Sequence, residues 1–340
     1  MKFIPKLLAS VLFAGSAALA SAATYNELFV FGDSLSDPGN AYYLTGNNAA
    51  LWASTGHPLD AQGHFSNGPT AAEYLANALG INPTKGWAVG GGNNFAVGGA
   101  LTGAGNILGG LVAPLSNTGV ASQVAKFTPG PGFNASTTLF MVQGGGNDFL
   151  QTFDYMAAHP GLSAAGTTAL INNLINTASS NMADNIYQLG LKGATNILWT
   201  DMPDLGLIPE TALKGPSFQF LASQLSAAFN AALAAKIAVA DASLDAIMGY
   251  NVNVFGFSES AFLQAAAASQ PLNLLAPCVT VPGALPSCTG MFFYDSVHPT
   301  TATHALLAQQ LLAAAVPEPE MWLLMMVGVG IVGLRARRKA

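Results

Sequence analysis

The chain has 340 residues, of which 51% are hydrophobic and 8% charged, and its formal net charge is −6 at pH 7. All three arginines and three of the lysines lie in the first 22 and last 25 residues, so the chain between them keeps five lysines and fifteen acids, a net charge of about −10. This composition excludes a basic surface for nucleic-acid phosphates and a bidentate arginine clamp on a phosphate or carboxylate.

Residues 1–22 predict a secretory signal peptide. Lys2 and Lys6 provide its positive region, residues 7–20 its apolar stretch, and Ala20-Ser21-Ala22 a cleavage site of small residues, so we expect cleavage after Ala22. The alternative is a buried N-terminal helix, which the charges, the length and the small-residue ending disfavour.

Residues 23–315 predict one α/β domain, because no linker or internal repeat divides them and such folds reach this length. Short apolar runs predict strands at 28–31, 94–97, 138–143, 196–200 and 252–255. Helical spacing and proline starts predict helices at 70–79, 164–189, 217–248 and 300–315. Strands that alternate with helices indicate a parallel sheet covered on both faces.

Unusual loops follow three of these strands. Gly32-Asp33-Ser34 follows the first, Gly98-Gly99 the second, and residues 144–148 the third. In open parallel sheets, ligands bind beyond the carboxyl ends of the strands. The sequence therefore predicts a site at this edge of the sheet.

Residues 29–40 read FVFGDSLSDPGN, and Ser34 there is either a turn residue or a nucleophile. Gly, Asp, Ser, Pro and Asn are ordinary turn residues, so the segment alone favours a turn, with Asp33 and Asp37 as its braces. Near the other end, FFYDSVHPT holds Asp295 and His298 three residues apart. A turn with this spacing lets an imidazole face an acid with one nitrogen and a serine with the other. A lone D-x-x-H pair also fits a surface loop.

Acyl transfer needs donors for a developing oxyanion. Gly98 and Gly99 in FAVGGA offer backbone N–H groups that no side chain shields, and Asn147 in GGGNDF offers a side-chain amide. Each is ambiguous alone, because glycine-rich turns and Asn helix caps are common. The neighbouring Asp148 is interpreted as a helix cap. The chain lacks a P-loop, a dinucleotide fingerprint and the G-x-S-x-G nucleophile elbow.

Other polar and aromatic side chains are interpreted as structural. Four histidines are assigned no catalytic role, because three lie in loop-like stretches without a partnered acid and one lies inside the last helix: His57, His64, His159 and His304. Three aromatic residues fit either the wall of an acyl pocket or the core: Trp52, Phe65 and Phe149.

Cys278 and Cys288 are the two cysteines of the chain. An exported protein meets an oxidising compartment, so the pair predicts one disulfide that closes a small loop. The alternative is two free thiols. No C-x-x-C or His/Cys cluster indicates zinc, and we expect no metal.

Residues 316–340 differ in composition from the domain before them. Val316-Pro317-Glu318-Pro319 precedes an uncharged segment at 321–334 and a basic tail. As a helix the uncharged segment spans about 21 Å, short of a hydrocarbon core of about 30 Å, but the basic tail favours a transmembrane anchor whose end stays in the cytoplasm. This terminus resembles a bacterial PEP-CTERM sorting signal. The resemblance implies an inner-membrane anchor that an exosortase removes, which leaves the protein at the cell surface or outside the cell.

Taken together, FVFGDSLSDPGN, NFAVGGA, GGGNDF and DSVHP resemble the motifs of the GDSL lipases/esterases, or SGNH hydrolases, in order and approximate spacing. GHFSNGPTAAEYLA, at 63–76, is similar to a further segment of many members. The resemblance runs from about residue 27 to 314. It implies a three-layer α/β/α sandwich of the flavodoxin-like kind, with a central parallel sheet and no metal or organic cofactor.

The resemblance also implies roles for matching residues. Ser34 is the expected nucleophile and a backbone oxyanion donor, Asn147 the side-chain donor, His298 the base and Asp295 its orienting acid. Gly99 is the expected third donor, with Gly98 next. The implied function is an exported serine hydrolase of lipid or short acyl esters. A carbohydrate O-acetyl esterase acting on extracellular polysaccharide and a non-catalytic surface protein on the same fold remain alternatives.

Overall fold

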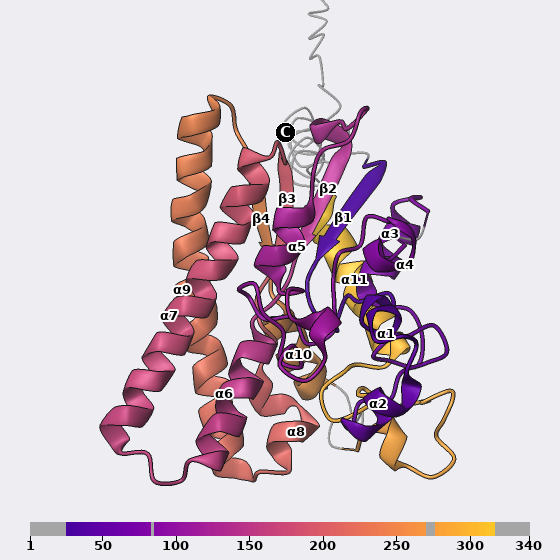
Figure 1. Ribbon diagram of the computed structural model, residues 1–340, viewed down its shortest axis with the longest axis vertical. Coiled ribbons are helices and arrows are strands. Elements are labelled where there is room, and N and C mark those ends of the chain that lie inside the picture. The colour runs from indigo at the N-terminus through magenta and orange to yellow at the C-terminus, as the bar shows by residue number, and fades with distance from the viewer. Residues whose placement is uncertain (1–24, 83–84, 270–275, 317–340) are drawn as a thin grey trace, which may run out of the picture. The chain divides into compact units, whose positions relative to one another are not determined.

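A sheet of four parallel strands lies at the centre of the molecule. The computed structural model describes residues 25–82, 85–269 and 276–316 (Figure 1). In spatial order the strands are β1 (Glu27–Phe31), β2 (Thr138–Val142), β3 (Asn196–Thr200) and β4 (Asn253–Phe257). Every neighbouring pair is parallel, with Phe29 opposite Phe140 and Leu198 opposite Phe255. Four of the five predicted strands are therefore present.

The predicted strand at 94–97 is wrong as a strand. This segment runs beside β1, since the N–H of Phe95 donates to the oxygen of Val30 at 2.7 Å and the N–H of Val97 to Gly32 at 3.1 Å. The side chain of Asn94 accepts the N–H of Ala96 at 3.0 Å. That local turn competes with a regular ladder, so an isolated bridge between Val30 and Asn94 replaces the strand.

The strands alternate their side chains between two apolar clusters, as the period of two requires. Phe31 and Phe140 belong to one cluster, whereas Val30 and Leu139 belong to the other. Both faces of the sheet are thus buried, which explains why the strands read as continuous apolar runs.

Helices cover both faces. The first cluster is closed by α5 (Val120–Lys126), α6 (Gly146–Ala158), α7 (Ala164–Leu191) and α9 (Pro216–Met248). The second is closed by α3 (Ala71–Ala78) and α11 (Thr301–Ala315), which lie on the other side of the strands in Figure 1. Short helices occupy the connections: α1 (Asn40–Leu44), α2 (Ala49–Ser54), α4 (Trp87–Gly90), α8 (Pro209–Ala212) and α10 (Glu259–Ser269). The structure confirms the predicted α/β/α sandwich.

The four predicted helices end within two residues of the observed ones. Local caps explain this agreement: Thr70 forms a capping box with Glu73, and the side chain of Thr300 accepts the N–H of Thr303. Helix α6 was not predicted. The interpretation of Asp148 as a helix cap indicated a helix start near this position, but the observed N-cap is Gly145, which makes no side-chain cap hydrogen bond.

A disulfide joins Cys278 and Cys288, whose Cα atoms lie 5.4 Å apart. The N–H groups of Cys278 and Val279 donate to the oxygens of Phe293 and Tyr294, at 3.0 and 2.9 Å. The bridged loop is therefore fastened to the chain that leads into Asp295.

The predicted signal peptide at 1–22 and the predicted anchor at 321–334 lie outside the described residues. Across the three described ranges, no helix has the length and apolar character needed to cross a membrane.

Candidate active site

The predicted catalytic residues meet beyond the carboxyl ends of β1 and β2. Ser34 lies three residues after β1, and Asn147 lies in the first turn of α6, which follows β2. Asp295 and His298 lie in the loop before α11. Residues separated by up to 264 positions therefore converge at one edge of the sheet.

Ser34, His298 and Asp295 form a continuous hydrogen-bonded chain. The hydroxyl of Ser34 lies 2.8 Å from Nε2 of His298, and Nδ1 of His298 lies 2.7 Å from Oδ2 of Asp295. A carboxylate accepts hydrogen bonds, so the proton of neutral His298 lies on Nδ1 and Nε2 accepts from Ser34. This is the geometry in which a serine hydroxyl loses its proton to an imidazole.

Asp295 is fully buried and remains an anion. Burial would raise the pKa of its carboxyl, but the charges and hydrogen bonds of His298 and His57 hold that pKa well below its usual range. Its other oxygen, Oδ1, accepts the N–H groups of Val297 and His298 at 2.8 and 2.7 Å. The acid thus fixes both the ring and the backbone of the base.

Residues 65–69, Phe-Ser-Asn-Gly-Pro, secure the chain just after His298. The hydroxyl of Ser66 donates to the oxygen of Pro299 at 2.9 Å, and the side chain of Asn67 accepts the N–H of Thr301 at 2.9 Å. This contact gives the motif resemblance at 63–76 a physical role, since it holds the base loop at the start of α11.

Each of the three expected oxyanion donors has an N–H group without an acceptor in the described residues. Within the described residues, the backbone N–H groups of Ser34 and Gly99 make no hydrogen bond. The amide of Asn147 donates one hydrogen to the oxygen of Ala100 at 3.0 Å, which leaves its second hydrogen available. An oxyanion requires donors that are not already paired, and these three meet that requirement.

The N–H groups of Gly98 and Gly99 differ in whether they have an acceptor. The N–H of Gly98 donates to Oδ2 of Asp37 at 2.7 Å. Asp37 also accepts the N–H groups of Gly39, Asn40 and Ala41, so it joins the start of α1 to the glycine loop. Burial raises the pKa of Asp37 to about 6, and these N–H groups oppose that rise. The N–H of Gly98 is thus engaged by Asp37, while Gly99, at φ +78°, keeps an N–H without an acceptor in the described residues.

Buried amides hold the loop that presents Ser34. Gln123 of α5 accepts the N–H of Gly32 and donates to its oxygen, both at 2.8 Å. The hydroxyl of Ser36 donates to Gln143 at 2.7 Å, and Asp33 accepts the N–H of Leu35 at 3.1 Å. Asp33 and Asp37 therefore brace the turn as the sequence suggested.

Asp148 does not cap α6, contrary to the interpretation from sequence. Its carboxylate accepts the backbone N–H and the hydroxyl of Thr102, at 3.0 and 2.9 Å. The cap position belongs to Gly145. Asp148 instead joins α6, which carries Asn147, to the loop that follows Gly99.

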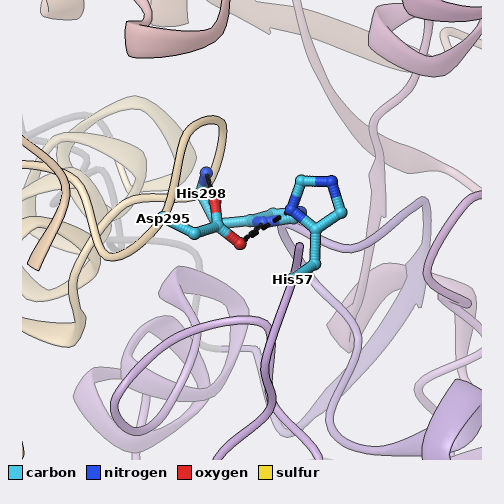
Figure 2. A group of neighbouring side chains, drawn as sticks. All are labelled: His57, Asp295 and His298. Carbon is cyan, nitrogen blue, oxygen red and sulfur yellow. Dashed lines mark hydrogen bonds and ion pairs between the residues drawn. The ribbon is translucent and has the colours of Figure 1, made fainter. Parts of the chain in front are cut away.

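His57 contradicts the sequence interpretation, because it has a partnered acid. Its Nδ1 lies 2.9 Å from Oδ2 of Asp295, the oxygen that also binds His298 (Figure 2). The two residues are 238 positions apart, and no local motif marks His57, so the sequence carried no signal for this contact.

The other three histidines make no hydrogen bond to Ser34, His298 or Asp295 within the described residues. Burial lowers the pKa of His64, but hydrogen bonds to Asp60 and Glu73 outweigh it and raise the pKa to about 10, so this ring is a buried cation. His159 contacts the oxygen of Tyr155 in an exposed position. Burial lowers the pKa of His304 to about 3, which keeps that ring neutral.

A shared metal ion is the other chemistry that the cluster of His57, Asp295 and His298 suggests. Their ligand atoms all lie within 4.8 Å of one another. Both Nδ1 atoms, however, lie at hydrogen-bond distance from the same carboxylate oxygen, and a metal would need lone pairs where these contacts need protons. The geometry favours a proton network.

An apolar pocket opens beside Ser34 and Asn147. Its wall consists mainly of side chains from α6, α10 and the loops after β3 and before α11, among them Leu150, Leu205, Leu263, Phe292 and Val297. The three aromatic residues considered from sequence do not line it. Phe149 lies in the core, and Trp52 packs edge-on against Phe65, whose ring centroid lies 5.1 Å from that of His298.

Comparisons with known proteins add an independent finding. The family model for the GDSL-like Lipase/Acylhydrolase domain matches residues 28–311, and the model for the PEP-CTERM protein-sorting motif matches residues 315–339.

Several bacterial proteins are similar to this chain. An uncharacterized protein in the trpE-trpG intergenic region of Pseudomonas putida is 31% identical over 332 residues, 88% of this chain and 50% of its own length. The thermolabile hemolysin of Vibrio parahaemolyticus is 27% identical over 85% of this chain and 64% of its own length. Esterase EstA of Pseudomonas aeruginosa is 29% identical over 89% of this chain and 48% of its own length. The chain thus spans about half to two thirds of these relatives.

Two solved structures also align with the chain, each at 19% identity. Phospholipase A1 from Streptomyces albidoflavus NA297 has a TM-score of 0.41 and covers 86% of this chain and 100% of its own. The extracellular lipase from Streptomyces rimosus has a TM-score of 0.37 and covers 85% of this chain and 99% of its own.

Gly98→Ala should destabilise the protein by about 1–3 kcal/mol, the usual effect of overpacking. A Cβ at this position would lie 2.2 Å from the ring of Phe65, which packs on His298. Urea unfolding of the parent and the variant measures the change. Gly161→Ala is the control, because its Cβ would meet open space. Equal unfolding free energies for the parent and Gly98→Ala would contradict the tight contact.

Proposed function

The chain belongs to the GDSL-like lipase/acylhydrolase family, and from this premise we propose that it is an exported serine hydrolase that cleaves carboxylic esters. The observation that carries the proposal is the hydrogen-bonded chain from Ser34 through His298 to Asp295. A non-catalytic protein on the same fold does not require this alignment, nor free donors beside a serine.

The proposed reaction proceeds through an acyl-enzyme. Nε2 of His298 takes the proton of Ser34 as its Oγ attacks the ester carbonyl carbon, and Asp295 stabilises the imidazolium. The N–H groups of Ser34 and Gly99 and the amide of Asn147 donate to the oxyanion. Collapse of this intermediate expels the alcohol, which receives the proton from His298. Water then attacks the acyl-enzyme by the same route and releases the acid.

The apolar pocket supports an aliphatic acyl chain as the group bound next to Ser34. Its wall is mostly hydrocarbon, and the removal of apolar surface from water contributes about 0.8 kcal/mol per CH₂. An acetyl group would leave most of such a pocket unused. We therefore favour esters of longer aliphatic acids over O-acetyl groups of a polysaccharide, which is the alternative substrate class.

The two ends of the sequence support export. The signal peptide predicted at 1–22 would direct secretion, and the PEP-CTERM motif at 315–339 would make the chain a substrate of an exosortase. In this proposal the segment at 321–334 anchors the chain in the inner membrane until it is removed. The processed enzyme then acts at the cell surface or outside the cell.

Ser34→Ala should reduce hydrolysis of a short acyl ester by at least ~10³-fold, because the nucleophile is lost. Asn147→Ala should reduce kcat by about 10²–10³-fold, because one oxyanion donor is lost. Steady-state kinetics with p-nitrophenyl butyrate measure both. Ser136→Ala, at the opposite end of β2 on an exposed turn, is the matched control and should keep the parent rate. A Ser34→Ala protein as active as the parent, or a parent that a fluorophosphonate does not label at Ser34, would end the proposal.

The parent should hydrolyse p-nitrophenyl octanoate with a kcat/KM at least ~10-fold above that for the acetate, since each buried CH₂ adds binding free energy. Leu150→Trp, which narrows the pocket, should reduce the octanoate value more than the acetate value. Leu213→Trp places the same bulk on an exposed position and serves as control. Faster release of acetate from acetylated glycans than of octanoate would favour the polysaccharide alternative.

Protein recovered from the cell surface or medium should begin at Ala23 and lack the segment at 321–340. Intact-mass measurement of that material in a host with an exosortase checks both cuts. Retention of Met1 would refute the signal peptide, and an intact C-terminus in exported protein would refute the sorting step.

A further inference from the structure

His57 brings a second imidazole to the acid of the proposed triad. It lies in the loop after α2, where its N–H donates to the oxygen of Trp52 at 3.3 Å. From there Nδ1 reaches Oδ2 of Asp295 at 2.9 Å, against 2.7 Å for His298 (Figure 2). The rings of His57 and His298 meet edge to face, with centroids 5.1 Å apart and planes at 87°.

We propose that His57 is a positioning residue that shares the carboxylate of Asp295 with His298 and so sets how strongly His298 holds its proton. The inference rests on the proposed ester hydrolysis for its catalytic meaning. His57 does not line the apolar pocket, so it acts on the base through Asp295 and not on the acyl chain.

The hydrogen bonds of Asp295 determine which nitrogen of His57 carries a hydrogen. Asp295 is an acceptor at both oxygens, so Nδ1 of His57 must carry a hydrogen, as Nδ1 of His298 does. Nε2 of His57 makes no hydrogen bond within the described residues, and the side chain is 30% exposed. Solvent therefore reaches the ring that binds the buried acid.

Sharing weakens the pull of Asp295 on His298. Two donors on one oxygen divide its charge, so the imidazolium that His298 forms during acylation receives less stabilisation than from an undivided carboxylate. In return, Oδ2 is held from two directions and Asp295 stays in line with Nδ1 of His298. A base with a lower proton affinity is neutral, and active, at lower pH.

The groups that face His57 explain why it too responds to pH. Asp295 and His298 lie on the loop before α11, and Glu210 on α8, where it pairs with Lys214 at 3.2 Å. The N–H of Glu210 donates to the oxygen of Ser296 at 2.9 Å, which ties α8 to the same loop. Burial would lower the pKa of His57, but Asp295 and Glu210 raise it above its usual value. As pH falls His57 becomes protonated, and the resulting imidazolium competes more strongly with His298 for the carboxylate of Asp295.

Two substitutions separate donation from space filling. His57→Phe keeps a ring against His298 but removes the donor. His57→Asn places an amide nitrogen where Nδ1 lies, so it keeps the donor without the charge.

For His57→Phe we expect kcat to fall about 10-fold at its plateau with KM nearly unchanged, because Oδ2 of Asp295 is then held from one side only and the lost alignment outweighs the stronger pull on His298; the size is that of one charge-assisted hydrogen bond. We also expect the acid limb of kcat/KM to move to higher pH, because His298 then has the whole carboxylate. His57→Asn should recover most of kcat and return the acid limb toward that of the parent. An acid limb that is the same in all three proteins, or an Asn variant as slow as the Phe variant, would overturn the proposal.

Nuclear magnetic resonance titration of ¹⁵N-labelled histidine rings in a Ser34→Ala background tests the coupling without turnover. The signals of His298 should titrate at higher pH when His57→Phe is added. A parent that hydrolyses no ester would end the proposed function, while this titration would still decide whether His57 shares Asp295. Unchanged His298 titration would refute the sharing.

Discussion

The buried carboxylate of Asp295 is the interaction on which the site depends. A fully buried anion costs several kcal/mol unless hydrogen bonds and opposite charge offset that cost. Asp295 accepts from two imidazoles and two backbone N–H groups, and three of these four donors belong to Val297 and His298 in the same loop before α11. The disulfided loop and the Ser66 and Asn67 contacts hold the chain on either side of that acid. Stability and catalytic geometry therefore have the same origin in this loop.

A second buried acid, Asp37, organises the opposite side of the site. Its carboxylate accepts the N–H of Gly98, whereas the N–H of Gly99 has no acceptor in the described residues. Asp148 does similar work one loop further on, by holding Thr102 to α6. Two carboxylates outside the proposed chemistry thus hold the segments that carry Gly99 and Asn147.

The sequence was sufficient for the parts that local pattern determines. Apolar runs located the four strands, caps such as Thr70 and Thr300 located helix starts, and motif order brought Ser34, Asn147, Asp295 and His298 to one sheet edge. Long-range contacts that no motif marks could not be predicted from it. His57 reaches Asp295 from a loop with no motif. Asp148, in the first turn of α6, binds Thr102 instead of capping the helix. The segment at 94–97 has strand-like residues, but the side chain of Asn94 bonds its own backbone instead. The N–H of Gly98 is likewise engaged by a distant residue, Asp37, which the local sequence does not indicate.

The separation of 264 residues between Ser34 and His298 has a consequence for the order of assembly. A nascent chain acquires the serine early and the acid and base almost last, with β2, β3 and β4 to be added in between. Contacts of such sequence separation form late in folding, since the chain must first close a very long loop. Until the loop before α11 docks, the hydroxyl of Ser34 is an ordinary alcohol. A chain that still lacks this loop therefore also lacks the proposed base.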